Sequence, residues 1–156
     1  MTDLLQNRAD WELTNCSVAN ALDVLGNRTS LLIIREAFFG TRRFDDFASR
    51  VGISESSAAK RLAELTSANI LERRPYREPG QRERHEYVLT QKGSELRVVL
   101  TALRDWGDRW ESGSEGPPFH AVHRDCGEAV HAQIRCTGGH VVPLSGTTLL
   151  RGPASI

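Results

Sequence analysis

The chain has 156 residues, of which 39% are hydrophobic and 26% are charged. This composition excludes a disordered chain and is typical of one globular domain, with room for an appended element. No apolar run approaches the roughly 18 residues of a membrane span. The N-terminus lacks a signal segment and three cysteines are too few for a disulfide framework, so we expect a cytoplasmic protein.

Charge is unevenly distributed along this neutral chain. Residues 42–97 carry twelve basic and nine acidic side chains, whereas residues 1–41 carry three and five. Five arginines fall within residues 73–84. A locally basic segment is a typical electrostatic footprint for nucleic acid. A solvated charged face of no special function gives the same pattern, and that alternative stays open at this point.

Four short helices are predicted in the first 69 residues. Apolar residues at three- and four-residue spacing place them at about 16–26, 29–40, 43–52 and 54–69, and the first three end at a glycine. Ser54 is a good N-cap for the fourth helix. Only the four residues VGIS separate the third helix from the fourth, which is the outline of a helix-turn-helix.

The next segment predicts a β-hairpin behind the fourth helix. Residues 70–75 and 82–90 have strand-like sequences, and the residues PGQ between them are typical of a turn. A helix-turn-helix followed by a basic hairpin is a winged helix, a far more specific pattern than either half.

A fifth helix is predicted at about 91–111, with apolar residues at helical spacing from Leu96 to Trp110. We interpret its long stripe as a dimer interface, although core packing within one chain is the alternative. Residues 112–119 are a linker rich in Gly, Ser and Pro, and residues 120–156 are expected to form a terminal β-hairpin extension. The predicted class is thus mainly α with small β: a winged helix-turn-helix domain at 1–111, with a long dimerisation helix, followed by linker and extension.

The stretch 16–110 resembles the HxlR-type winged helix-turn-helix transcriptional regulators. The most specific pieces are RRFDDF, ILERRPY, the run EY-x-LT-x-KG at 86–93, and WGDRW. The resemblance implies a dimeric DNA-binding regulator from a bacterium or archaeon, a repressor or an activator. It leaves open a small-molecule or oxidant effector.

DNA contacts are expected from the fourth helix and the wing. A dimer would insert the fourth helix of each subunit into successive major grooves of a palindromic operator, with half-sites about 34 Å apart. We expect the homodimer to be held by the helices at 16–26 and 91–111. The alternative for each arginine singly is a surface ion pair with a nearby glutamate (Glu78, Glu83 or Glu86). The predicted DNA-binding residues are Arg42, Arg43, Ser54, Ser56, Ser57, Lys60, Arg61, Arg82 and Arg84.

Two other functions compete with that of a DNA-binding regulator. An enzyme is not expected, because the chain has no glycine-rich phosphate loop, nucleophile elbow or HExxH motif; no cofactor is expected either. A winged-helix domain used for protein interaction, without specific DNA binding, is the remaining alternative. Salt dependence separates the two, because release of counterions gives a steep slope only for phosphate contacts.

Cys16 is a candidate redox-sensing residue. In several members of the family that the chain resembles, a cysteine just before the first helix senses oxidants or electrophiles, and Cys16 matches that place. A thiol at a helix N-terminus has a lowered pKa and a more reactive thiolate when it is exposed. The alternative is a small buried residue beside the dimer interface.

The segment 123–140 contains a set of potential zinc ligands, His123, Cys126, Cys136 and His140. Zinc ribbons present two knuckles of two ligands each, and HRDCG has that form. In the second half, Gly139 stands where a ligand is expected, and His140 lies one place later. We therefore predict a ribbon-shaped hairpin without stoichiometric metal, with a Cys₂His₂ zinc site as the alternative.

Overall fold

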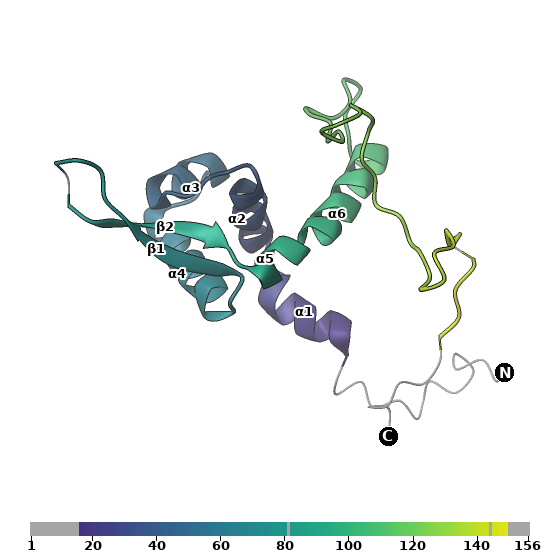
Figure 1. Ribbon diagram of the computed structural model, residues 1–156, viewed down its shortest axis with the longest axis horizontal. Coiled ribbons are helices and arrows are strands. Elements are labelled where there is room, and N and C mark those ends of the chain that lie inside the picture. The colour runs from purple at the N-terminus through teal and green to yellow at the C-terminus, as the bar shows by residue number, and fades with distance from the viewer. Residues whose placement is uncertain (1–15, 81, 144, 150–156) are drawn as a thin grey trace.

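The computed structural model describes residues 16–80, 82–143 and 145–149. The two ends of the chain, 1–15 in the predicted domain and 150–156 in the predicted extension, lie outside these residues. The mainly helical class with a small two-stranded sheet is confirmed (Figure 1). Within the described residues the elements are α1 Ser17–Leu25, α2 Arg28–Phe38, α3 Phe44–Val51, α4 Glu55–Ser67, β1 Leu71–Tyr76, β2 Arg84–Leu89, α5 Gln91–Glu95 and α6 Arg97–Trp110.

The core lies between α2, α3 and α4. Ile33, Ile34 and Phe47 are completely buried, and Leu62 and Leu65 of α4 close the cluster from the other side. Removing such side chains from water stabilises the fold by about 1.5–3 kcal/mol each. These buried contacts therefore hold α4 in place against α2 and α3, with its outer face directed away from the core.

The wing is an antiparallel pair of strands tied to the start of α3. Leu71 pairs with Leu89 at the base and Tyr76 with Arg84 toward the tip. Beside the sheet, the amide of Tyr87 donates to the carbonyl of Arg42 at 2.8 Å, and Arg43 forms an isolated bridge with Glu86. The wing is thus fixed to the helix-turn-helix by backbone contacts.

The single helix predicted at 91–111 is wrong, because the structure breaks it at Leu96. The backbone of Leu96 has ψ −7°, and its amide donates to the carbonyls of Gly93 and Ser94 where α5 ends. Leu96 packs on the core, so α5 stays against the body, and α6 points away from it (Figure 1). None of the helices in the described part of the chain is long and apolar enough to cross a membrane.

The extension has turns where a continuous β-hairpin was predicted. From Ser112 onward the described residues contain no helix or strand, only the isolated bridges Val122–Ala129 and Arg135–Val141. The segment that was expected to form one strand is instead held against α6 by hydrogen bonds. Arg104 of α6 donates to the carbonyl of Val130, and the amide of Ala132 donates to Asp105 at 2.6 Å.

Asp105 is the acceptor at the centre of this attachment. Burial raises the pKa of its carboxyl, but hydrogen bonds from the amide of Ala132 and from Arg104 outweigh burial, and the pKa is lowered. A carboxyl with a lowered pKa stabilises the folded state above its unfolded-state pKa and loses that contribution as the pH falls through its folded-state pKa. The attachment is therefore complete at neutral pH.

Candidate nucleic-acid interface

The turn between α3 and α4 is set by one glycine and one serine. Gly52 adopts a left-handed conformation (φ 70°), which a residue with a side chain rarely adopts. Ser54 then caps α4 by accepting from the amide of Ser57. Ser54, predicted as a DNA contact, thus already has a local structural task, and its hydroxyl lies 2.9–3.0 Å from those of Ser56 and Ser57.

The outward face of α4 presents the expected polar residues. Ala58, Leu62 and Leu65 face the core, which leaves Ser56, Ser57 and Lys60 exposed. Within the described residues Lys60 has no ion-pair partner, whereas Arg61 pairs with Glu64 one turn later. Lys60 is therefore the cation on this helix that is available to a phosphate or a base edge.

The wing carries two further available cations. Arg82 and Arg84 are exposed at and near its tip, and neither forms an ion pair with another residue of the described segments. The ion pair considered for these two arginines is not found there. Such cations are suited to bind phosphates along the edge of a groove.

Arg42 and Arg43 form ion pairs, as the alternative interpretation held. Arg42 lies 3.5 Å from Glu86, and Arg43 binds Glu78 at the wing. The hydrogen bond to Glu78 raises the pKa of the Arg43 guanidinium above its ordinary value. Ion pairs between exposed side chains are weak, so a phosphate can displace the carboxylate at low cost.

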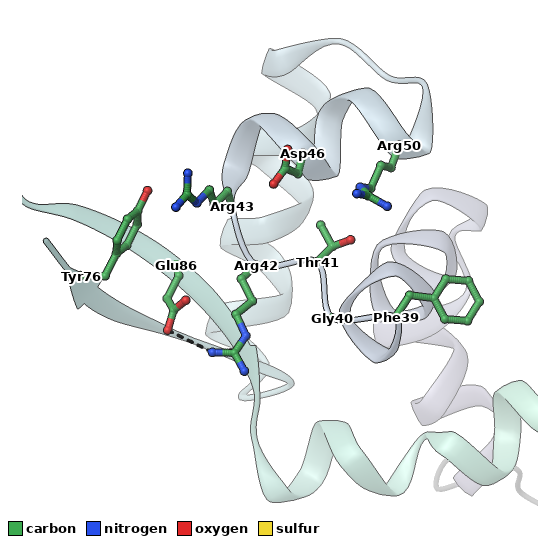
Figure 2. A pocket seen from close by; sticks show the side chains of 9 residues that line it. All are labelled: Phe39, Gly40, Thr41, Arg42, Arg43, Asp46, Arg50, Tyr76 and Glu86. Atoms are coloured by element: carbon green, nitrogen blue, oxygen red, sulfur yellow. Dashed lines mark ion pairs between the residues drawn. The ribbon is translucent and has the colours of Figure 1, made fainter. Parts of the chain in front are cut away.

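These two arginines line a depression of about 340 Å³ between the end of α2, α3 and the wing (Figure 2). Arg50 and Tyr76 also line it, and the guanidinium of Arg43 lies 5.2 Å from the centre of the Tyr76 ring. Sequence reasoning missed both residues. The spacing of Arg50, seven positions after Arg43 and thus on the same helical face, could have identified it.

The family model described as HxlR-like helix-turn-helix matches residues 24–115. The chain belongs to this family. An uncharacterised HTH-type transcriptional regulator of Mycobacterium tuberculosis, Rv3095, is 41% identical over 121 residues, which cover 78% of this chain and 75% of the relative. This HxlR-like protein is thus a transcriptional regulator with a helix-turn-helix fold, as its family and relatives are, and not an enzyme.

Solved structures support the same assignment. A protein described as a candidate transcription factor, PA1607, matches with a TM-score of 0.78 and 33% identity, covering 89% of this chain and 96% of its own. The reduced form of the transcriptional regulator YodB from Bacillus subtilis matches with a TM-score of 0.53 and 31% identity, covering 61% of this chain and 92% of its own. YodB has also been solved after treatment with diamide.

Cys16 occupies the N-cap position of α1 in this HxlR-like chain. Its carbonyl accepts from the amide of Asn20 at 2.9 Å, and its side chain makes no capping hydrogen bond. The residue is half-buried, so it is neither the freely exposed thiol nor the enclosed apolar residue of the two predictions. Its redox role stays a prediction.

The four potential zinc ligands form two separate pairs. The ring Nδ1 of His123 lies 3.2 Å from the sulfur of Cys126, and that of His140 lies 3.5 Å from the sulfur of Cys136. Two thiols and two imidazoles suit Zn²⁺ chemically. However, no group of three or more potential ligands comes together in the described part of the chain, so this arrangement does not provide a tetrahedral set. Absence of stoichiometric zinc stays a prediction.

Proposed function

We propose that the protein is a homodimeric, sequence-specific DNA-binding transcriptional regulator that acts in the cytoplasm on a palindromic operator. Helix α4 of each subunit enters the major groove, and the wing contacts the flanking backbone. Arg42 and Arg43 exchange their glutamate partners for phosphates at the edge of the site. Whether the outcome is repression or activation depends on where the operator lies relative to the promoter.

The observation that carries this proposal is the set of cations left without an acidic partner. Within the described residues Lys60 of α4 and Arg82 and Arg84 of the wing have none, although many other arginines of the chain do. All three belong to the two elements that a winged helix presents to DNA. Other cations of the described residues, such as Arg97 and Arg109 of α6, also lack an ion pair, so it is the position of Lys60, Arg82 and Arg84 on these two elements that favours DNA.

Two uncovered apolar faces support the dimer. On α1, Val18 and Leu22 are exposed and only Leu25 is buried, and on α6 Trp106 and Trp110 are 58% and 66% exposed. Aromatic side chains of this size are enriched in the buried centre of interfaces and are costly to leave in water. A second copy that packs α1 and α6 against their equivalents would cover both faces.

Salt dependence tests the proposal. After binding-site selection from random duplexes, we expect the logarithm of the affinity for the selected operator to fall with the logarithm of salt concentration with a slope of about −5. This slope is the value for the three unpaired cations of each of two subunits alone, which make six phosphate contacts, and the contacts of Arg42 and Arg43 add to its magnitude. Fluorescence anisotropy measures the affinity, and sedimentation equilibrium of the same sample should give twice the chain mass of 17.4 kDa. A slope near zero, or no selected sequence, would rule out the proposal and favour the protein-interaction module.

Thiol oxidation is expected to release DNA through Cys16. The thiol lies at the start of α1, next to the proposed dimer interface, so modification there alters how the two subunits pack. Diamide should weaken operator binding by the wild type about tenfold or more and leave Cys16→Ser unaffected. The matched control is the double variant Cys126→Ser with Cys136→Ser, which removes the two exposed thiols and should respond as the wild type does. Equal release from wild type and Cys16→Ser would remove the sensor role.

A further inference from the structure

A cavity of about 570 Å³ lies between α2, α6 and the first part of the extension. Phe38, Leu100, Val122 and Val130 are among its apolar lining residues. At its edge Phe119, the last residue of the predicted linker, packs on Phe39 at the end of α2, with ring centroids 5.3 Å apart. The volume is within the 300–1,000 Å³ range of small-molecule sites. None of the predicted DNA-binding residues is among the described residues that line it, although Phe39 also lines the depression beside Arg42.

The charged residues that line the cavity all have the same sign. Arg35, Arg97 and Arg104 contribute guanidinium groups, and none of the described residues that line the cavity carries a carboxylate. Glu36 and Asp105 balance the charges of Arg35 and Arg104, so Arg97 is the cation whose charge favours an anion in this apolar space.

One of these guanidinium groups is free to take up that anion. Arg35 already binds Glu36, and Arg104 binds Asp105. Arg97 stacks over the Phe38 ring at 5.3 Å and has no ion-pair partner within the described residues. In addition, the Nε of Arg35 is buried without a hydrogen-bond partner, and a buried donor left unpaired is costly unless a ligand or water satisfies it.

We propose that this cavity binds an organic carboxylate with an aromatic or aliphatic body. The carboxylate pairs with Arg97, and the body lies against Phe38, Leu100 and the wall formed by Val122 and Val130. This site is distinct from the DNA interface and from Cys16, and its occupancy does not depend on whether the protein binds DNA.

The extension makes such a ligand capable of affecting the regulator. Val130 lines the cavity and is also held by Arg104 of α6 through its carbonyl. A molecule in the cavity therefore contacts α2, α6 and the extension together and strengthens the attachment of the extension to the helix. Because α6 is half of the proposed dimer interface, occupancy is expected to alter the geometry of the two DNA-binding units.

Isothermal titration calorimetry of the full-length protein, without DNA, tests the site. It compares the binding of carboxylic acids with that of the corresponding neutral amides. The probes are 2-naphthoate, 4-tert-butylbenzoate and decanoate, each against its own amide. We expect at least one acid to bind about tenfold or more tightly than its amide, because a charge-assisted hydrogen bond to Arg97 is lost in the amide. Arg97→Met should abolish this preference, and Val130→Trp, which fills the cavity from the extension, should abolish binding of both. Arg109→Met, on the same helix but outside the cavity, should bind as the wild type does.

Several results would overturn the site. These are acids that bind no better than their amides, an Arg97→Met variant that keeps the preference, or no binding by any of the three acids. If a second copy of the chain fills the space, Val130→Trp converts the dimer to a monomer in sedimentation while no acid binds, which also overturns the proposal. Circular dichroism of each variant separates loss of the site from loss of the fold.

Discussion

Replacing Lys60 and Arg61 together with alanine is expected to abolish specific operator binding, with a loss of at least about 100-fold in affinity and no loss of the folded dimer. Lys60 is exposed on α4 and has no acidic partner in the described chain, and Arg61 is held by Glu64 beside it. Neither belongs to the buried residues of α4, which are Ala58, Leu62 and Leu65, although Arg61 is half-buried at the edge of that face, so the core is left intact. If each contacts one phosphate in each subunit, the magnitude of the log–log salt slope should fall by about 0.9 per lost contact.

The matched control for this double variant is Arg124→Ala with Arg135→Ala. It also removes two positive charges, but both lie in the extension and are exposed. A general effect of net charge would weaken both double variants equally, whereas contacts from α4 weaken only the first. Unchanged affinity in the Lys60 and Arg61 variant would exclude α4 as the recognition helix and favour the protein-interaction function.

Gly93→Ala is expected to have the largest effect on stability of any glycine substitution outside the turns. A Cβ atom at this position would lie 2.2 Å from the carbonyl oxygen of Ile70 and 3.0 Å from a methyl group of Leu89. The carbonyl cannot easily move, since the amide of Thr90 donates to it at 3.0 Å. Overpacking of this kind costs about 3 kcal/mol, which lowers the melting temperature by about 6–12 °C in a chain of this size.

Gly107→Ala is the matched control, because a Cβ there meets no atom within 4 Å. Gly107 lies inside α6, where alanine is the better helix former by about 1 kcal/mol, so this variant should be slightly stabilised. Thermal unfolding at one fixed protein concentration compares the two, since dimerisation makes the midpoint depend on concentration. Equal melting temperatures in the two variants would contradict the close approach of α5 to Ile70.

The same contacts give a physical reason for the run LT-x-KG, one of the motifs behind the family resemblance. The hydroxyl of Thr90 accepts from the amide of Gly93 and donates to the carbonyl of Asn69 at 2.6 Å. Lys92 donates to the carbonyl of Ala68 at 2.8 Å, at the end of α4. The motif thus holds the start of α5 against the end of α4.

The helix-turn-helix and the wing could be predicted from the sequence because their signals are local. Ser54 caps α4, Gly52 permits the left-handed turn, and the alternation along β2 marks a strand. The break at Leu96 could not be predicted in this way. Leu96 and Leu100 pack on the core, whereas Leu103 and Trp106 are exposed, yet all four follow the same helical spacing.

The conformation of the extension depends on contacts with α6, which is distant in the sequence. Alternating apolar residues from Val130 onward predicted a strand, but the backbone of Val130 and Ala132 binds Arg104 and Asp105 of α6. A local pattern contains no information about such a contact. The cavity was missed for the same reason, since its lining comes from α2, α6 and the extension.

The break at Leu96 also makes α6 a lever arm for the proposed dimer. Helix α6 has 14 residues and is therefore about 21 Å long. A rotation of about 10° at Leu96 displaces its far end by about 4 Å, close to the 3.4 Å rise of one base pair. Two subunits joined along α6 can thus change the distance between their recognition helices by about one base pair at each joint. In the proposed dimer, such a rotation would adjust the positions of the two recognition helices along the operator without repacking of either core.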